Sequence, residues 1–435
     1  MMKKREMNFR ELFLGMEQAI PLANGRKITP INFDNAATTP AMKQVLHCVN
    51  KFLPLYGSIG RGKGYKSKVS TELYNDARDE ILKFFNLSDR DDYTVIFVKN
   101  TTEGINTLVN ILIEDSSEIV LTTRMEHHSN DLPWREKCVV EYVEVDDNGR
   151  LKIDQFQERL DKAKGSIKLV SVTGASNVTG YINDIHKIAK IAHKNGAEII
   201  VDGAQLVPHR KVDMNYTDED EDDDIDYLVF SAHKMYAPFG SGAIVGKKNK
   251  FNNSLPLLKG GGTVDIVTDD EVYWLDAPER DEGGTPNVLG VIALVAAIYE
   301  FNRIGFNNIE EHEDLLRDYL SEGLRSMPDV ITYGDLNDKN KLGLVSINLK
   351  NIYHEDLAGM LSDLRGIAVR SGCFCAQPYA KRLLDVTDEE VLSFIRGNRG
   401  RKPGMVRISF GMYNTINEIN EFLNVLEYII RKHLY

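Results

Sequence analysis

The sequence predicts an α/β protein built on a mostly parallel sheet with helices on both faces. Five apolar runs rich in β-branched residues indicate buried strands, at residues 94–98, 118–122, 168–173, 198–201 and 227–230. Amphipathic stretches of helical length separate them, and this alternation is typical of parallel strands joined by helical crossovers. A smaller α+β portion follows, with strands predicted at 344–349 and 405–410 and a helix at 356–365.

The chain has 435 residues, enough for two or three domain-sized units. Residues 1–29 are predicted to form a polar helix and connector that pack beside the smaller domain. We expect a large domain over 30–300 and a small C-terminal domain over 301–435. Residues 57–67 form a glycine-dense basic loop, followed by a long helix predicted over 68–85. The loop fits either a flexible linker or a close approach of the backbone to a ligand.

Composition excludes several classes of protein. A formal net charge of -12 argues against nucleic acid or an anionic membrane surface as the main partner. Four cysteines in a chain of this length form no disulfide framework. The first ten residues lack the apolar stretch of a secretory signal, and the most apolar run, 291–299, is too short to span a bilayer. We therefore expect a cytoplasmic protein.

Lys234 is the first candidate for chemistry, because it follows a predicted buried strand and leads into a glycine-containing loop at 237–242. Most lysines lie at the surface, and that is the simplest interpretation of this one. Asp202, however, ends the preceding predicted strand. A lysine that forms a Schiff base and a carboxylate that keeps a pyridine nitrogen protonated are what a pyridoxal phosphate site needs. The pair alone is weak evidence without a phosphate cradle, a ring stack and a substrate anchor.

A phosphate cradle could lie at the start of the helix after the first strand. Asn100 and Glu103 have the spacing of a capping box, which predicts that the helix begins there. Free backbone amides at that start, with the hydroxyls of Thr101 and Thr102, can bind a phosphate. A plain N-cap is the commoner use of such residues, so this prediction depends on whether the helix start lies beside the lysine.

Two histidines and an acidic run invite metal interpretations. His127 and His128 have no third ligand at a matching spacing, and an imidazole stacked on an aromatic cofactor ring is the alternative use. The carboxylates of 218–224 fit a solvated loop better than a calcium site, because they lack the glycine and closing glutamate of an EF-hand. No G-x-G-x-x-G motif follows any predicted strand, so dinucleotide binding has no support. We expect no metal.

Cys373 and Cys375 lie two residues apart in a predicted loop, without the second pair that a zinc site requires. An accessible loop cysteine near basic groups is a candidate nucleophile, because its thiolate is favoured there. A structural cysteine is the commoner case.

With these pieces in order, the chain resembles the class V (aminotransferase V-fold) pyridoxal phosphate enzymes, most closely the Suf-type cysteine desulfurases and selenocysteine lyases. The resemblance covers nearly the whole chain and rests on the motifs Thr101-Thr102-Glu103-Gly104, Met125-Glu126-His127-His128, Ser176-Asn177-Val178, Val201-Asp202-Gly203-Ala204-Gln205, Ser231-Ala232-His233-Lys234 and Gly284-Thr285-Pro286-Asn287. It implies fold type I: a mostly parallel seven-stranded sheet in the large domain and a smaller α+β domain.

The resemblance also implies roles for the cofactor's neighbours. Lys234 would bind pyridoxal 5'-phosphate covalently and then move the substrate Cα proton. Asp202 would pair with the pyridine nitrogen, Gln205 would donate to the ring hydroxyl oxygen, and His127 would stack on the ring. Family members are homodimers with shared sites, so two subunits are expected to build each site.

The phosphate and the substrate would be held by further residues. The resemblance assigns the phosphate to Thr101, Thr102, Ser231 and His233, with Thr285 reaching the phosphate in the neighbouring subunit. It assigns substrate binding to Asn35, Asn177 and Arg407, of which the last two would grip the carboxylate.

The implied reaction takes sulfur from L-cysteine, leaving L-alanine and a persulfide on Cys375, from which an acceptor protein would receive the sulfur. The alternative is a class V aminotransferase, epimerase or other C–S or C–Se lyase without persulfide chemistry; a non-catalytic protein that retains the fold is the rival from another class. Two departures from the Suf pattern, Gly64 in place of a histidine and Cys373-Phe374 in place of histidines, leave the substrate and the sulfur-carrying cysteine open.

Overall fold

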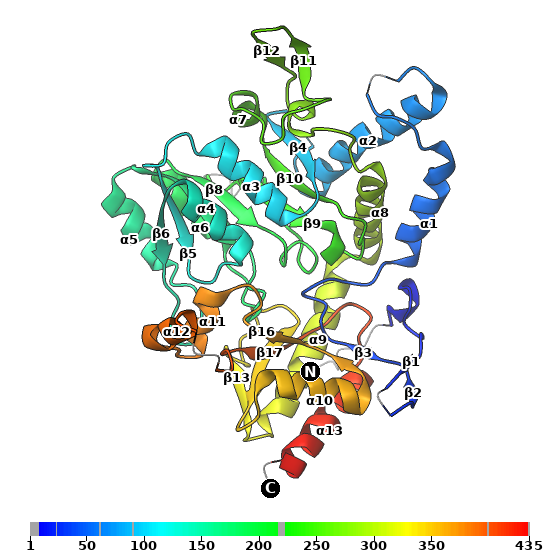
Figure 1. Ribbon diagram of the computed structural model, residues 1–435, viewed down its shortest axis with the longest axis vertical. Coiled ribbons are helices and arrows are strands. Elements are labelled where there is room, and N and C mark those ends of the chain that lie inside the picture. The colour runs from blue at the N-terminus through cyan, green and yellow to red at the C-terminus, as the bar shows by residue number, and fades with distance from the viewer. Residues whose placement is uncertain are drawn as a thin grey trace.

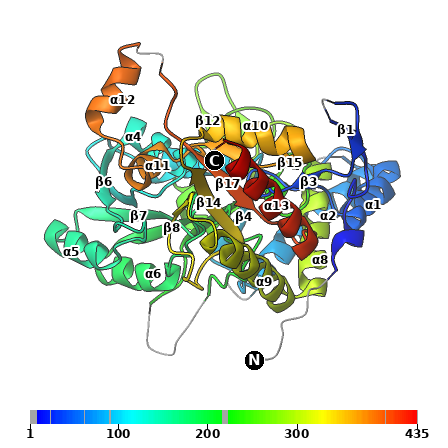
Figure 2. The same cartoon turned by 90° about the horizontal axis from the view of Figure 1, so that it is seen from below.

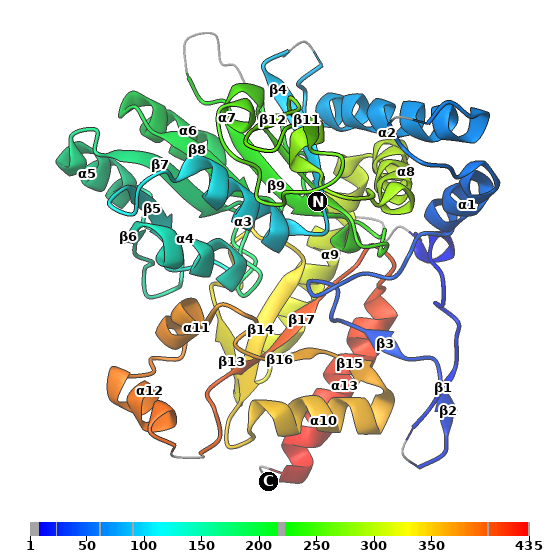
Figure 3. The same ribbon diagram turned by 45° about the horizontal axis from the view of Figure 1, so that its top comes forward.

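The computed structural model describes residues 8–22, 24–60, 62–88, 91–215, 222–397 and 400–433. A seven-stranded sheet forms the upper half of the molecule, and a four-stranded sheet lies below it (Figures 1 and 3). The predicted domain boundary at residue 300 falls inside helix α8 (Val288–Ile304) and stays a prediction.

The large sheet has the strand order β4-β10-β9-β8-β7-β5-β6. Its strands are β4 (Tyr93–Val98), β5 (Ile119–Thr123), β6 (Val139–Val143), β7 (Ile167–Thr173), β8 (Glu198–Asp202), β9 (Tyr227–Ser231) and β10 (Gly242–Lys247). Neighbours from β9 to β6 are parallel, and β10 runs antiparallel to both β9 and β4. The prediction of a mostly parallel seven-stranded sheet is confirmed.

Helices cover both faces of this sheet because its strands are apolar on both sides. In β9, Leu228 and Phe230 point into a core shared with α2, α5, α6 and α8, whereas Tyr227 and Val229 point into a second core against α3 and α4. Full burial of each such side chain contributes ~1.5–3 kcal/mol. The helices of this half are α1 (Lys43–Phe52), α2 (Tyr65–Phe84), α3 (Thr101–Leu112), α4 (Leu132–Lys137), α5 (Asp154–Ala163), α6 (Ile185–Lys194), α7 (Lys248–Asn252) and α8.

The small sheet has the order β13-β14-β17-β16 and packs α9 (Phe306–Arg325), α10 (His354–Arg365) and α13 (Ile416–His433) on one face, as seen from below in Figure 2. Val406 and Ile408 of β17 point into the core with those helices, so the alternation of a strand turns Arg407 toward the large sheet. The elements are α9 (Phe306–Arg325), β13 (Val330–Tyr333), β14 (Leu344–Leu349), α10 (His354–Arg365), β15 (Ile367–Ala368), β16 (Arg370–Gly372), α11 (Gln377–Leu383), α12 (Asp388–Ile395), β17 (Met405–Ser409) and α13 (Ile416–His433).

The N-terminal segment differs from its prediction. Its described part, residues 8–22 and 24–29, holds a 3-10 helix (Arg10–Leu12) and a hairpin of β1 (Ile20–Pro21) and β2 (Lys27–Ile28), so the predicted polar helix is wrong there. Gly15 and Gly25 have φ of +77° and +80°, a conformation that an α-helix cannot contain. The connector continues into β3 (Ile31–Asn32), which pairs in parallel with β15 (Ile367–Ala368) in a separate two-stranded sheet.

Two surface segments complete the description. A hairpin of β11 (Val264–Val267) and β12 (Val272–Trp274) protrudes from the large half (Figure 1). The acidic run 218–224 was predicted to be a solvated loop, and its residues 218–221 lie outside the described residues. Asp223 is buried, and His186 Nδ1 contacts its carbonyl oxygen, so Asp223 does not fit that prediction. No single described helix is long and apolar enough to cross a membrane, and only the bent pair α8–α9 meets those criteria jointly.

Candidate active site

A cavity of about 330 Å³ lies where the parallel strands β7, β8 and β9 end, facing the small sheet. Ligands of open α/β sheets bind at such carboxyl ends. Most of the predicted site residues line it: Thr101, Thr102, His127, Asn177, Asp202, Gln205, Ser231, His233, Lys234, Cys375 and Arg407. The fold therefore brings together residues that lie up to three hundred positions apart in the chain.

Lys234 lies in the 3-10 turn directly after β9 and is partly buried. Its Nζ makes no hydrogen bond or ion pair with any residue that the structure describes. Burial lowers the pKa of this amine to about 8, with Asp202 opposing the shift and Arg407 adding to it. A lysine with such a pKa is substantially neutral near pH 8 and can act as a nucleophile or a base.

Asp202 ends β8 and is buried, with the backbone N–H of Ala204 donating to its Oδ1 at 3.0 Å. Burial raises the pKa of this carboxyl group, and the Lys234 charge opposes the shift. Gln205 is buried beside it and donates one amide hydrogen to the carbonyl oxygen of Ala36 at 2.7 Å. An amide carries two such hydrogens, so the second remains for a ligand.

The start of helix α3 forms a polar corner of the cavity. Asn100 caps the helix by accepting from the N–H of Glu103 at 3.0 Å, so the predicted helix start is confirmed. The hydroxyl of Ser231, at the end of β9, accepts from the N–H of Thr101 at 2.8 Å. Thr102 Oγ1 lies 2.7 Å from another hydroxyl, that of Ser129. Hydroxyls gathered at the start of a twelve-residue helix suit a phosphate.

Two imidazoles in the cavity are held neutral. Burial, with the nearby Lys234 charge, lowers the pKa of both His127 and His233 to about 4. His127 Nδ1 accepts from the backbone N–H of Ser129 at 3.1 Å, which assigns its ring proton to Nε2. A neutral imidazole fixed in this way presents a face suited to stacking on an aromatic ring.

Arg407 of β17 is 2% exposed, and its guanidinium is oriented by two acceptors. Nη1 donates to the carbonyl oxygen of Asn177 at 2.9 Å, and Nη2 donates to Asp34 Oδ1 at 3.2 Å. Its buried Nε has no partner among the described residues. A buried donor without an acceptor costs about 1–3 kcal/mol, which indicates that a ligand supplies the acceptor.

The structure separates the two loop cysteines. Cys375 is exposed and lines the cavity, and its carbonyl oxygen accepts from the N–H of His128 at 2.6 Å. Cys373 is half-buried outside the lining, its Sγ donates to the carbonyl oxygen of Pro403 at 3.2 Å, and burial raises the pKa of its thiol. In this conformation Cys375 is therefore the thiol that can reach a molecule in the cavity.

Two predicted site residues do not line the cavity. The side chain of Asn35 is buried and donates to the carbonyl oxygens of Asn32 and Ser409, so it fixes the chain beside the cavity. Thr285 is exposed in a glycine turn elsewhere on the surface. Gly64, the position of one departure from the Suf pattern, also lies outside the lining, and a Cβ built there meets open space.

Sequence reasoning missed three residues around Arg407. Phe374 and Arg370 line the cavity, and Asp34 forms ion pairs with both arginines, at 2.7 Å from Arg370 Nη2. The pairing of β16 with β17 places Arg370 opposite Arg407. The signal available was Arg370 just before the predicted cysteine loop and Arg407 in the predicted strand 405–410, but only the register shows that the two are neighbours.

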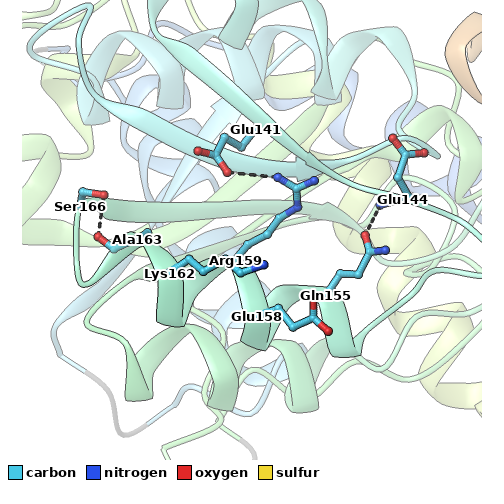
Figure 4. Close-up of a pocket in the computed structure, with 8 residues that line it drawn as sticks. All are labelled: Glu141, Glu144, Gln155, Glu158, Arg159, Lys162, Ala163 and Ser166. Carbon is cyan, nitrogen blue, oxygen red and sulfur yellow. Dashed lines mark hydrogen bonds and ion pairs between the residues drawn. The ribbon is translucent and has the colours of Figure 1, made fainter.

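A second hollow, of about 450 Å³, lies between β6 and α5 (Figure 4). Two pairs of its polar groups are already in contact: Arg159 Nη1 lies 3.2 Å from Glu141 Oε2, and Gln155 Oε1 accepts from the N–H of Glu144 at 3.0 Å. It contains none of the predicted site residues. Over the described ranges, no group of three or more histidine, cysteine or carboxylate side chains could hold a metal ion.

The comparisons with known proteins agree with this geometry. The model of the aminotransferase class-V family matches residues 31–422. A cysteine desulfurase of Haloferax volcanii is 32% identical over 424 residues, covering 95% of this chain and 93% of the relative. One from Shigella sonnei is 32% identical over 408 residues, covering 92% and 93%.

Solved structures give the same result. The apo structure of a cysteine desulfurase from Thermococcus onnurineus NA1 matches with a TM-score of 0.81 at 32% identity, covering 93% of this chain and 95% of that one. A cysteine desulfurase from Escherichia coli, with an S-sulfonic acid, matches with a TM-score of 0.80 at 25% identity, covering 97% and 98%. The chain belongs to the aminotransferase class-V family and has the fold of its cysteine desulfurases.

Proposed function

We propose that this protein is a pyridoxal phosphate-dependent cysteine desulfurase, which converts L-cysteine to L-alanine and leaves a persulfide on Cys375. The observation that carries the proposal is that an amine of lowered pKa, a carboxylate, an arginine with a free donor and an accessible thiol line one cavity. The names of the relatives and of the similar solved structures support the same reaction.

The residues present fit the cofactor. Lys234 Nζ has no described partner and can bind the aldehyde carbon, Asp202 can face the ring nitrogen, and the second amide hydrogen of Gln205 can meet the ring oxygen. His127 would stack on the ring. The phosphate would be held by Thr101, Thr102, Ser231 and His233. When bound, pyridoxal phosphate supplies an electron sink for the bonds at the substrate Cα.

The chain's own groups then carry out the transfer. Arg407 holds the substrate carboxylate, together with Asn177, and fixes Cα beside Lys234. Lys234, whose pKa of about 8 lies near working pH, accepts the proton from Cα and returns a proton to the carbon skeleton. The Cys375 thiolate attacks the substrate sulfur: a sulfur–sulfur bond forms, the carbon–sulfur bond breaks, and its electron pair takes up a proton to complete alanine.

A matched pair of cysteine variants tests this proposal. With a reductant present, we expect Cys375→Ala to lose at least 90% of alanine formation from L-cysteine, whereas Cys373→Ala keeps most of it. The measurement is alanine and sulfide released per subunit, with the persulfide on the protein located by alkylation and peptide mass. Equal turnover in Cys375→Ala would contradict the persulfide role and favour a lyase, aminotransferase or epimerase that needs no thiol.

We further propose a homodimer with shared sites. Four apolar side chains of the β11–β12 hairpin are 45–58% exposed, as expected of a surface that a partner covers: Ile266, Val267, Val272 and Tyr273. The N–H of Gly284 donates to the carbonyl oxygen of Gly261, tying the Thr285 turn to the base of this hairpin. Thr285 would thus approach the partner's phosphate. A cytoplasmic location and a sulfur-acceptor protein remain predictions.

A further inference from the structure

Phe374 is the residue between the two loop cysteines, and it contacts the site in two ways. The residue is 8% exposed and lines the cavity, and the centroid of its ring lies 5.0 Å from Cζ of Arg407. Its carbonyl oxygen accepts from Asn177 Nδ2 at 2.7 Å. The carbonyl oxygen of Asn177 in turn accepts from Arg407 Nη1 at 2.9 Å. The three residues therefore form a closed set of contacts.

These contacts orient the Arg407 guanidinium and leave its Nε–H unused. Asn177 and Asp34 accept from its two terminal nitrogens, and the Phe374 ring covers the guanidinium at cation–π distance. Nε remains without a partner among the described residues. A carboxylate that binds there meets a guanidinium already held in one plane, so little rotamer entropy is lost on binding.

We propose that Phe374 is a positioning residue for the carboxylate of the amino-acid substrate, acting through Arg407. This inference rests on the proposed function for its substrate, and it goes beyond it because Phe374 stands where the Suf-type pattern has a histidine. An uncharged ring over the guanidinium adds attraction without competing for its hydrogen-bond donors, whereas a histidine would add a titratable group.

The same residue begins the turn that carries the thiol. Phe374 and Cys375 have φ of +53° and +54°, the left-handed region in which non-glycine residues are uncommon. Asn177 holds the carbonyl oxygen of the first, and His128 holds that of the second. The carboxylate anchor and the thiol are thereby fixed to each other through backbone contacts, which a change of the Phe374 side chain leaves in place.

Two variants and two substrates test the proposal in the holoenzyme. Phe374→Leu keeps an apolar side chain without a π face, and we expect it to raise KM for L-cysteine about 5- to 30-fold while kcat changes less than threefold. Phe374→Tyr restores the face and is expected to stay within threefold of wild type. Cysteamine lacks the carboxylate, so its KM in Phe374→Leu should stay within twofold.

A measurement without turnover separates this inference from the proposed function. The bound cofactor's absorbance is titrated with L-alanine and, as the carboxylate-free control, ethylamine. Phe374→Leu should weaken L-alanine binding by the same 5- to 30-fold and leave ethylamine unchanged. Failure of wild type to form alanine from L-cysteine would sink the proposed function alone. Three results would overturn the role of Phe374. The first is that Phe374→Leu binds L-alanine within twofold of wild type, and the second is that its binding of ethylamine weakens equally. The third is that Phe374→Tyr is as impaired as Phe374→Leu.

Discussion

The lowered pKa of Lys234 predicts how the cofactor-free protein captures pyridoxal phosphate as pH changes. Only the neutral amine attacks an aldehyde. With a pKa of about 8 instead of the ordinary 10.5, about a quarter of Lys234 is neutral at pH 7.5, against about one part in a thousand for an ordinary lysine. The neutral fraction available for capture is therefore about 250-fold higher than for an exposed lysine, and the capture rate per site should exceed that of an exposed lysine. Because the pKa is lowered, the rate should rise about tenfold per unit below pH 7 and level off above pH 9.

Stopped-flow absorbance of the apoprotein mixed with pyridoxal phosphate, from pH 6 to 10, measures this profile. Dividing each rate by that of an α-blocked lysine, itself expressed per neutral ε-amine, removes the cofactor's own titration. Lys234→Ala is the control for other lysines and should show no site-specific phase. Arg407→Gln removes a charge that lowers the pKa of Lys234, so its profile should move to higher pH. A wild-type rate that still rises tenfold between pH 9 and 10 would refute the lowered pKa.

Two further predictions concern stability and assembly. Arg78 is buried, and its Nη2 lies 2.7 Å from Glu282 Oε2. Glu282→Gln leaves this arginine without its charge partner, so urea titrations should show a free energy of unfolding lower by ~3–5 kcal/mol. A loss below about 1 kcal/mol would contradict the buried pair. By light scattering, wild type should have twice the mass of one chain. The double variant Val267→Glu/Tyr273→Glu should be a folded monomer, whereas the control Ile395→Glu, at a more exposed apolar residue outside the hairpin, should stay a dimer. A dimeric double variant would exclude the hairpin from the interface.

The site residues that the sequence predicts well are those at the ends of buried strands. Asp202, Ser231 and Lys234 each come directly after or at the end of a buried strand, and parallel strands carry such residues to one edge of a sheet. The capping-box spacing of Asn100 and Glu103 likewise predicts the start of helix α3 from neighbouring residues alone. Local patterns of this kind need no knowledge of the tertiary fold, and the strands and helix starts that they predict are the ones observed.

The parts that were missed depend on contacts between distant segments. Asp34 follows a two-residue strand near the N-terminus and reaches arginines more than 330 positions away. Phe374 looks like an ordinary apolar loop residue until the pairing of the small sheet places Arg407 beneath its ring. The N-terminal hairpin was missed although Asn24-Gly25 is a turn signal, because strands of two residues each are too short to show a period-2 alternation.

The cysteine loop is fixed mainly by hydrogen bonds to its own backbone atoms. Asn177 Nδ2 and the N–H of His128 donate to the carbonyl oxygens of Phe374 and Cys375, and His128 Nε2 accepts from the N–H of Gln377. Such contacts are indifferent to side-chain identity. A substitution at position 373 removes the contact of its Sγ with Pro403 but leaves these backbone contacts in place, so the thiol of Cys375 keeps its position. The path of the loop and the identity of its side chains are thus set separately: backbone contacts fix where the thiol lies, and the side chain at 374 is left to act on Arg407.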